Sequence, residues 1–100
     1  MPTNGQAIEA ACLTTLTEPT RLAIVRALAT GAKTVTELAK ASGVEIVDAA
    51  RHLSILKDCG LVRTERDGRF MRYNLVGATL DGTTMTLAHA SGAKVVIPMA

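Results

Sequence analysis

The chain has almost no aromatic residues, with one Phe, one Tyr and no Trp among its 100 residues. Nearly half of the residues are apolar, so the core has to be built from Ala, Leu, Val and Ile. A chain of this length buries roughly two-thirds of its unfolded surface, which gives only modest stability. We therefore expect a single small folded unit that gains buried area by forming a homodimer.

The sequence also lacks the features of secreted and membrane proteins. No apolar run approaches the length of a membrane span, so we expect no membrane partner. The first five residues do not form a charged region followed by an apolar one, and no signal peptide is expected. Cys12 and Cys59 lie far apart without CxxC spacing, which favours a reduced, cytoplasmic protein.

The net charge of +2 excludes no class of binding partner, but the distribution of the charges along the chain is informative. Residues 51–73 contain six basic and three acidic side chains, so this segment carries +3 and the rest of the chain −1. Positive charge concentrated in one segment is typical of a surface that binds nucleic acid.

Capping signals and apolar spacing predict two helices in the first third of the chain. Residues 4–16 begin with capping-box spacing and place Ile8, Cys12 and Leu16 on one stripe. Pro19 suits the first position of a second helix, where its missing N–H is not needed. The expected buried face of this second helix consists of Leu22, Val25, Leu28 and Ala29.

Two further helices follow, joined by a short turn. Thr34 and Glu37 have capping-box spacing and open a helix over residues 35–41. After a Ser-Gly turn, a fourth helix is expected over residues 45–58, with Gly60 ending it. Its expected core side consists of Ile46, Ala49, Ala50, Leu53 and Leu56. Such a helix pair sets its second helix into the major groove of DNA.

A charged hairpin is predicted after these helices. Asp67-Gly68 suits a type I′ turn, which would pair Arg66 with Arg69, Thr64 with Met71, and Val62 with Tyr73. Val62, Met71 and Tyr73 would then share the inner face. Arg63 would face Arg72 on the outer face, where like charges repel unless an anion lies nearby, which is a small argument for phosphate.

The last quarter of the chain is rich in Thr and Val and is predicted as strands. A three-residue loop at 90–92 would align Met85 and Leu87 with Val95 and Ile97 on one face. A two-residue loop would scramble the apolar faces. Such a hairpin is marginal alone, so we expect it to pack on the rest of the chain or on a partner chain.

Four segments carry a family resemblance. They are LTEPTRL (16–22), TVTELA (34–39), RHLSILKDCGLV (51–62) and GRFMRYNL (68–75). In this order and spacing they resemble the ArsR-type (arsenic-repressor-like) winged helix family over about three-fifths of the chain. The resemblance implies a homodimeric bacterial repressor of transcription that binds double-stranded DNA, with helix four as recognition helix and the hairpin as wing.

The expected fold is therefore α+β: a winged helix-turn-helix with a C-terminal β-hairpin extension in place of the family's last helix. Residues 1–75 would form the DNA-binding domain, and residues 76–100 an extension for dimerisation or packing. The resemblance also places helix one in the dimer interface, with Ile8, Cys12 and Leu16 as its candidate contacts.

Candidate DNA contacts come from helix three, helix four and the wing. They are Thr36, Val47, Asp48, Arg51, His52, Arg63, Arg66, Arg69 and Arg72. Val47 suits a thymine methyl group, and Asp48 can accept from a cytosine amino group. The family has small polar residues at the start of helix four, whereas this chain has Glu45, Ile46, Val47, Asp48 and Ala50 there. Because carboxylates are unfavourable beside phosphate, the alternative is a protein-interaction module that has lost DNA reading.

Neither an enzyme nor a cofactor is expected, because the sequence has no P-loop, catalytic triad or paired carboxylates. No metal site is expected either. The family's thiolate site would need cysteines near residues 35–38, and His52, His89, Cys12 and Cys59 show no ligand spacing. A thiol or metal sensor using Cys12 and Cys59 is a further alternative, although burial as small apolar side chains suits both better.

Overall fold

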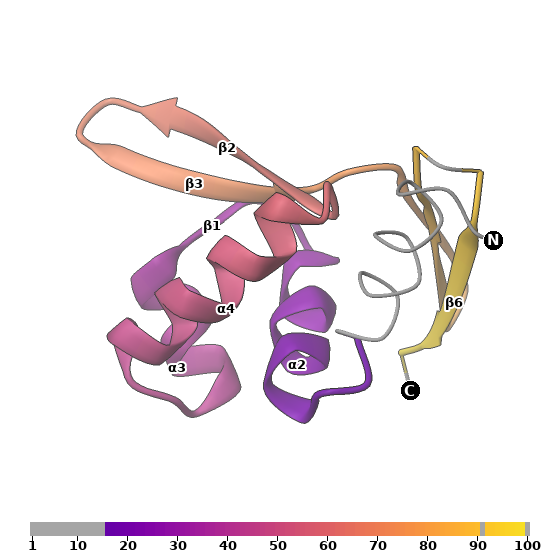
Figure 1. Cartoon of the computed structure of the whole chain (residues 1–100), viewed down its shortest axis with the longest axis horizontal. Helices are drawn as coiled ribbons and strands as arrows, with labels where there is room; N and C mark the ends of the chain where they lie inside the picture. The colour runs from indigo at the N-terminus through magenta and orange to yellow at the C-terminus, as the bar shows by residue number, and fades with distance from the viewer. Residues whose placement is uncertain (1–15, 91, 100) are drawn as a thin grey trace, which may run out of the picture.

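The computed structural model describes residues 16–90 and 92–99 (Figure 1). The helix predicted over residues 4–16, including Ile8 and Cys12, lies outside the described residues, except for Leu16 at its end. The described elements are α2 (Pro19–Leu28), β1 (Lys33–Thr34), α3 (Val35–Ser42), α4 (Ile46–Asp58), β2 (Val62–Asp67), β3 (Phe70–Leu75), β4 (Ala78–Asp81), β5 (Thr84–Ala88) and β6 (Lys94–Pro98).

Local capping signals place α2 and α3 as predicted. Pro19 is in the first turn of α2, and the Glu18 carboxylate accepts a hydrogen bond from the Arg21 N–H at 2.9 Å. At α3, the Glu37 N–H donates to the Thr34 hydroxyl at 3.3 Å, and the Thr34 N–H donates to the Glu37 carboxylate at 2.9 Å. The predicted capping box is therefore confirmed, and it fixes where α3 begins.

The core is aliphatic, as the shortage of aromatic residues requires. It joins the three helices, the base of the β2–β3 hairpin and one face of the C-terminal strands. Its buried members are Leu16, Ile24, Val25, Leu28, Leu38, Leu53, Leu56, Leu61, Val62, Met85, Leu87 and Ile97.

The hairpin of β2 and β3 forms as expected, but its register differs from the prediction. Asp67 pairs with Phe70, so the turn residues are Gly68 and Arg69 rather than Asp67 and Gly68. Gly68 has a φ of +61°, and no non-glycine residue in the described chain has a positive φ. A type I′ turn needs two positive φ values, so the structure selects a turn in which glycine alone takes the left-handed conformation.

This change of register removes the predicted repulsion between two arginines. Arg63 lies opposite Asn74, and Arg72 lies opposite Glu65. The argument for phosphate drawn from an Arg63–Arg72 pair is therefore wrong. The shift is two residues, so it leaves each side chain on its predicted face of the hairpin.

A third strand, which the sequence did not predict, completes this sheet in the order β1-β3-β2. Lys33 of β1 pairs with Tyr73, and Thr34 pairs with Arg72. The strand has only two residues, which is too short for an alternating apolar pattern. It fastens the hairpin to the residue that caps α3.

The C-terminal strands form a second sheet, in the order β4-β5-β6. The predicted register is confirmed: Met85 pairs with Ile97, and Leu87 pairs with Val95. The strand β4 lies in the quarter of the chain that was predicted as strands, but its pairing with β5, in which Leu80 lies opposite Met85, was not predicted.

This second sheet packs against the helices. In the core cluster, Met85, Leu87 and Ile97 join the apolar residues of the helices. The Arg26 Nε donates to the Pro98 carbonyl at 3.2 Å, and a His89 ring nitrogen lies 2.8 Å from the Cys59 carbonyl at the end of α4. The expected packing of the hairpin on the rest of the chain is therefore observed.

Figure 1 shows the β2–β3 hairpin extending over α3 and α4 at one end of the molecule, with β6 at the other end. Among the described residues, the helices are too short or too polar to cross a membrane.

Candidate nucleic-acid interface

The turn between α3 and α4 is built on Gly43. This residue has a φ of +71°, and its N–H donates to the carbonyl of Lys40 at 3.4 Å. The Val44 N–H donates to the Ala39 carbonyl at 3.1 Å, which ends α3 tightly. The chain then enters α4 at Glu45, the N-cap residue, whose side chain makes no capping hydrogen bond. The exposed first turn of α4 follows directly.

The exposed face of α4 differs from the predicted one. Ala49, Leu53 and Leu56 are buried as expected, but Ile46 is 50% exposed and Ala50 is exposed. Their assignment to the core side was wrong. Residues 46 and 50 lie at the edge of the stripe that 49, 53 and 56 define, and the neighbouring helices α2 and α3 cover only that stripe.

Val47, Asp48 and Arg51 are also exposed on α4. Val47 is 79% exposed. The Arg51 guanidinium lies 3.9 Å from the Asp48 carboxylate, and both side chains are largely exposed. A surface pair of this kind is weak, so Arg51 can leave Asp48 for another anion at little cost.

His52, by contrast, points into the protein and is 8% exposed. Its Nδ1 lies 2.9 Å from the Arg21 Nη1. A guanidinium has donors only, so the Nδ1 accepts this hydrogen bond and the ring proton is on Nε2. The Glu18 carboxylate, 3.8 Å from the same Nδ1, completes the group. His52 therefore ties α4 to α2, on the side away from Val47.

The four wing arginines fall into two groups. Among the described residues, no carboxylate lies within ion-pair distance of the exposed Arg63, Arg66 or Arg69 side chains. Arg72 is 35% exposed and has two carboxylate partners, as described next. The first three arginines have their charge available to a ligand.

Arg72 joins the wing to α3. Its Nε donates to the Asp67 carboxylate at 2.9 Å, and its Nη1 lies 3.6 Å from the Glu37 carboxylate. Hydrogen bonds from the Thr34 N–H and hydroxyl, together with the nearby Arg72 charge, hold the pKa of Glu37 below its usual value. Glu37 thus stays ionised and serves both the capping box and Arg72.

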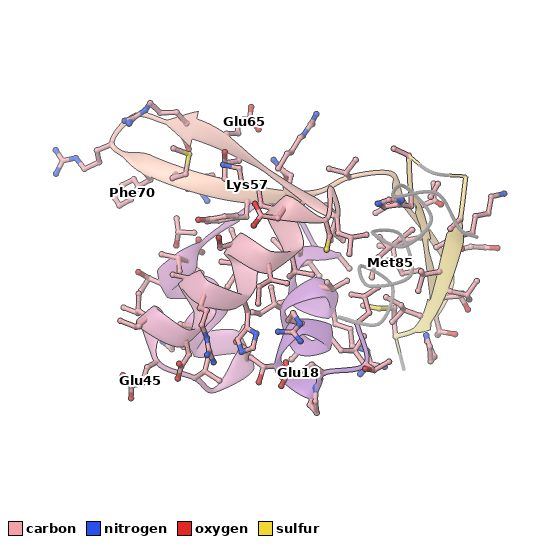
Figure 2. The ribbon with its side chains drawn as sticks, viewed as in Figure 1. Glu18, Glu45, Lys57, Glu65, Phe70 and Met85 are labelled. Atoms are coloured by element: carbon pink, nitrogen blue, oxygen red, sulfur yellow. The ribbon has the colours of Figure 1, made fainter. Side chains whose placement is uncertain are left out.

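A hollow of about 500 Å³ lies between the wing and the start of α3. It is lined on α3 by Val35, Thr36 and Glu37, and on the wing by Arg69, Phe70 and Tyr73. Figure 2 shows Phe70 on the wing and Glu45 before α4 at the same end of the molecule, with Met85 far from both.

The structure thus gathers most of the candidate contacts at one end. Thr36, Arg69 and Arg72 line the hollow, and the exposed side chains of α4 lie on the helix that follows α3. His52 is separate from them. Sequence reasoning missed Ile46 and Phe70 as exposed residues of this surface. The spacing of apolar residues alone does not show whether a given apolar side chain faces the core or the solvent.

No group of three or more His, Cys, Asp or Glu residues that could hold a metal ion occurs within residues 16–90 and 92–99. Cys59 is half-buried at the end of α4, where its carbonyl lies 2.8 Å from a His89 ring nitrogen.

A helix-turn-helix followed by a three-stranded sheet with a protruding hairpin defines a winged helix-turn-helix protein. Residues 18–64 match the family described as bacterial regulatory protein, arsR family. An ArsR-like transcriptional regulator from Rhodococcus sp. RHA1 has a similar structure, with a TM-score of 0.68 and 31% identity over 75% of this chain and 71% of that one. The chain therefore belongs to the ArsR family, which consists of transcriptional regulators rather than enzymes.

Two other relatives are informative. A probable mercury resistance operon repressor from Streptomyces lividans is 37% identical over 60 residues, which are 60% of this chain and 48% of that protein. The homodimeric winged helix-turn-helix domain Mb0332 from Mycobacterium bovis has a TM-score of 0.65 and 29% identity, over 74% of this chain and 72% of that one. The chain spans about half the length of the curated relatives that it matches.

Proposed function

We propose that the protein is a DNA-binding transcriptional repressor that acts as a homodimer in the cytoplasm. The observation that carries this proposal is the exposure of the first turn of α4 at the same end of the molecule as a wing with three arginines free of carboxylate partners. Membership of the ArsR family and similarity to a probable mercury resistance repressor support it.

In this proposal α4 enters the major groove, and Val47, Asp48 and Arg51 face the bases. Arg63, Arg66 and Arg69 of the wing, with Thr36 at the start of α3, contact the phosphate backbone. The remaining two candidates have partners within the protein, so Arg72 orients the wing and His52 holds α4, and neither needs to touch DNA itself.

The dimer is proposed by analogy with the homodimeric Mb0332 domain. Residues 1–75 form the DNA-binding domain, with Ile8 and Cys12 in the subunit contact. Leu16, the third candidate for that contact, is only 6% exposed and belongs to the core of its own chain. Residues 76–100 take the place of the family's last helix. Two copies of α4 would then enter successive major grooves about 34 Å apart.

The test is selection of bound duplexes from a random-sequence DNA pool at low salt. We expect recovery of a site with two related halves, separated by about one helical turn. If no duplex is enriched, and mixed genomic fragments at low salt are not bound either, the proposal is refuted.

A second candidate, a protein-interaction module, is favoured by one observation: the first turn of α4 exposes Ile46 and Val47 between the carboxylates of Glu45 and Asp48. Under that hypothesis the purified protein would fail to bind any duplex at low salt.

A further inference from the structure

We infer that the first turn of α4 reads thymine methyl groups in the major groove, with Val47 and Ile46 as the residues that determine specificity. This inference rests on the proposed function and narrows it to one chemical feature of the operator.

The first turn of α4 is unusually apolar for an exposed surface. Val47 is the most exposed of the large hydrophobic side chains in the described chain, at 79%, and Ile46 next to it is 50% exposed. Ala50, one turn further along, is exposed as well. Val47 lies opposite the buried stripe of α4, and Ile46 and Ala50 lie at its edge, where they are exposed.

The major groove offers such side chains one apolar partner. Guanine, cytosine and adenine present nitrogen and oxygen atoms there, whereas thymine also presents its C5 methyl group. Contact between Val47 or Ile46 and that methyl removes apolar surface from water on both sides. The same side chains over any other base would cover polar atoms without hydrogen-bonding them, which is unfavourable.

Asp48 sharpens this preference. Its carboxylate can accept a hydrogen bond from an amino group, but it has no donor for the N7 and O6 acceptors of guanine. We therefore expect a base with an exposed amino group, such as cytosine, next to the thymine contact. Guanine under Asp48 would be disfavoured.

The flanking charges favour DNA over a protein as the occupant of this surface. Arg51 follows on the same exposed face, and its pair with Asp48 is long, at 3.9 Å. Arg66 and Arg69 of the wing have no carboxylate partner in the part of the chain that the structure describes. An apolar patch at the same end of the molecule as these cations suits a polyanion that carries methyl groups.

The experiment replaces thymine by deoxyuridine, one position at a time, in the duplex recovered by selection. This change removes the methyl group and leaves base pairing intact. We expect affinity to fall roughly fourfold for each contacted methyl, from the burial of one carbon. It should stay unchanged at thymines outside the site.

Two protein variants assign the effect to α4. The double variant Ile46→Ser/Val47→Ser removes the methyl groups of both side chains, and it should bind the thymine and deoxyuridine duplexes more equally than the parent. Val96→Ser is the matched control, because Val96 is an exposed valine on the distant β6 strand. It should retain the full thymine preference. Thermal unfolding of each variant checks that the fold is kept.

The outcomes separate this inference from the proposed function. If the parent binds a selected duplex and every deoxyuridine substitution is neutral, or if Ile46→Ser/Val47→Ser keeps the parent's full preference, the thymine inference is wrong and the repressor proposal stands. If no duplex is selected at all, both fail.

Discussion

The wing arginines allow a quantitative prediction about the salt dependence of DNA binding. We consider the double variant Arg66→Gln/Arg69→Gln, which removes two exposed charges and leaves the turn glycine and the strand register untouched. Neither side chain has a carboxylate partner among the described residues, so no buried partner is orphaned and folding stability should change by less than about 0.5 kcal/mol.

The magnitude follows from counterion release. Each phosphate that a cation neutralises contributes about 0.9 to the slope of log Kobs against log salt concentration. Two arginines per wing and two wings per dimer should therefore lower the slope by about 3.6. The parent's advantage in affinity over the variant should therefore be about 150 times larger at 50 mM salt than at 200 mM salt.

The assay is a fluorescence anisotropy titration of one labelled duplex at four or five salt concentrations. Lys94→Gln is the control, because Lys94 is an exposed cation on β6, away from the wing, and its removal changes the net charge without removing a wing contact. If the double variant has the slope of the parent, or if Lys94→Gln lowers the slope by a similar amount per charge, the wing does not contact phosphate and this reasoning is refuted.

Three further predictions concern the scaffold that carries this surface. Thr34→Ala removes the hydroxyl that accepts from the Glu37 N–H and should lower the free energy of unfolding by about 1 kcal/mol in urea, whereas Thr34→Ser should restore it. The pKa of Glu37 is lowered mainly by the hydrogen bond from the Thr34 N–H, so its carboxylate stabilises the fold above pH 4.5 and this stabilisation is lost as the pH falls below that value. In Glu37→Gln the free energy of unfolding should therefore fall less on acidification than in the parent. An equal fall in both proteins would contradict this reasoning. Leu53→Ala truncates a fully buried side chain of α4 and should cost about 2–5 kcal/mol, whereas a Tm close to that of the parent would show that the site is not part of the core.

Local signals in the sequence were enough to predict most of the element boundaries. Pro19 and the Thr34–Glu37 capping box act within one helical turn, and their effect does not depend on the rest of the fold. The register of β5 and β6 was also predictable, because a slip of one residue would turn Met85 and Leu87 away from the core.

The wing register was not predictable by the same reasoning. A slip of two residues keeps every side chain on its face, so apolar alternation cannot distinguish the two registers. The register then depends on whether Asp67-Gly68 or Gly68-Arg69 forms the turn, and on contacts with residues that are remote in the sequence. Pairing of Lys33 with Tyr73 and the ion pair of Arg72 with Glu37 both favour the observed arrangement, and neither is visible in the hairpin's own sequence.

The exposed face of α4 could not be assigned from periodicity either. Ile46 precedes Ala49 by three residues and Leu53 by seven, so it fits a buried stripe as well as Leu56 does. Which end of the stripe is covered depends on how far α2 and α3 extend along α4. His52 was likewise named as a candidate DNA contact, and its burial could not be foreseen because its partner Arg21 is 31 residues away in the sequence.

The charges of α4 and of the wing differ in sign, which the total charge of the chain conceals. Residues 45–58, with two basic and three acidic side chains, carry −1, whereas residues 62–75, with four arginines and two acids, carry +2. Under the proposed function, attraction to the phosphate backbone must therefore come mainly from the wing, and α4 must act through contacts that do not depend on net charge. Asp48 lies in the first turn of α4, where the helix dipole favours a carboxylate, and Arg51 offsets part of its charge. An acidic first turn is then compatible with DNA binding, and it weakens binding to any sequence that does not match the apolar side chains beside it.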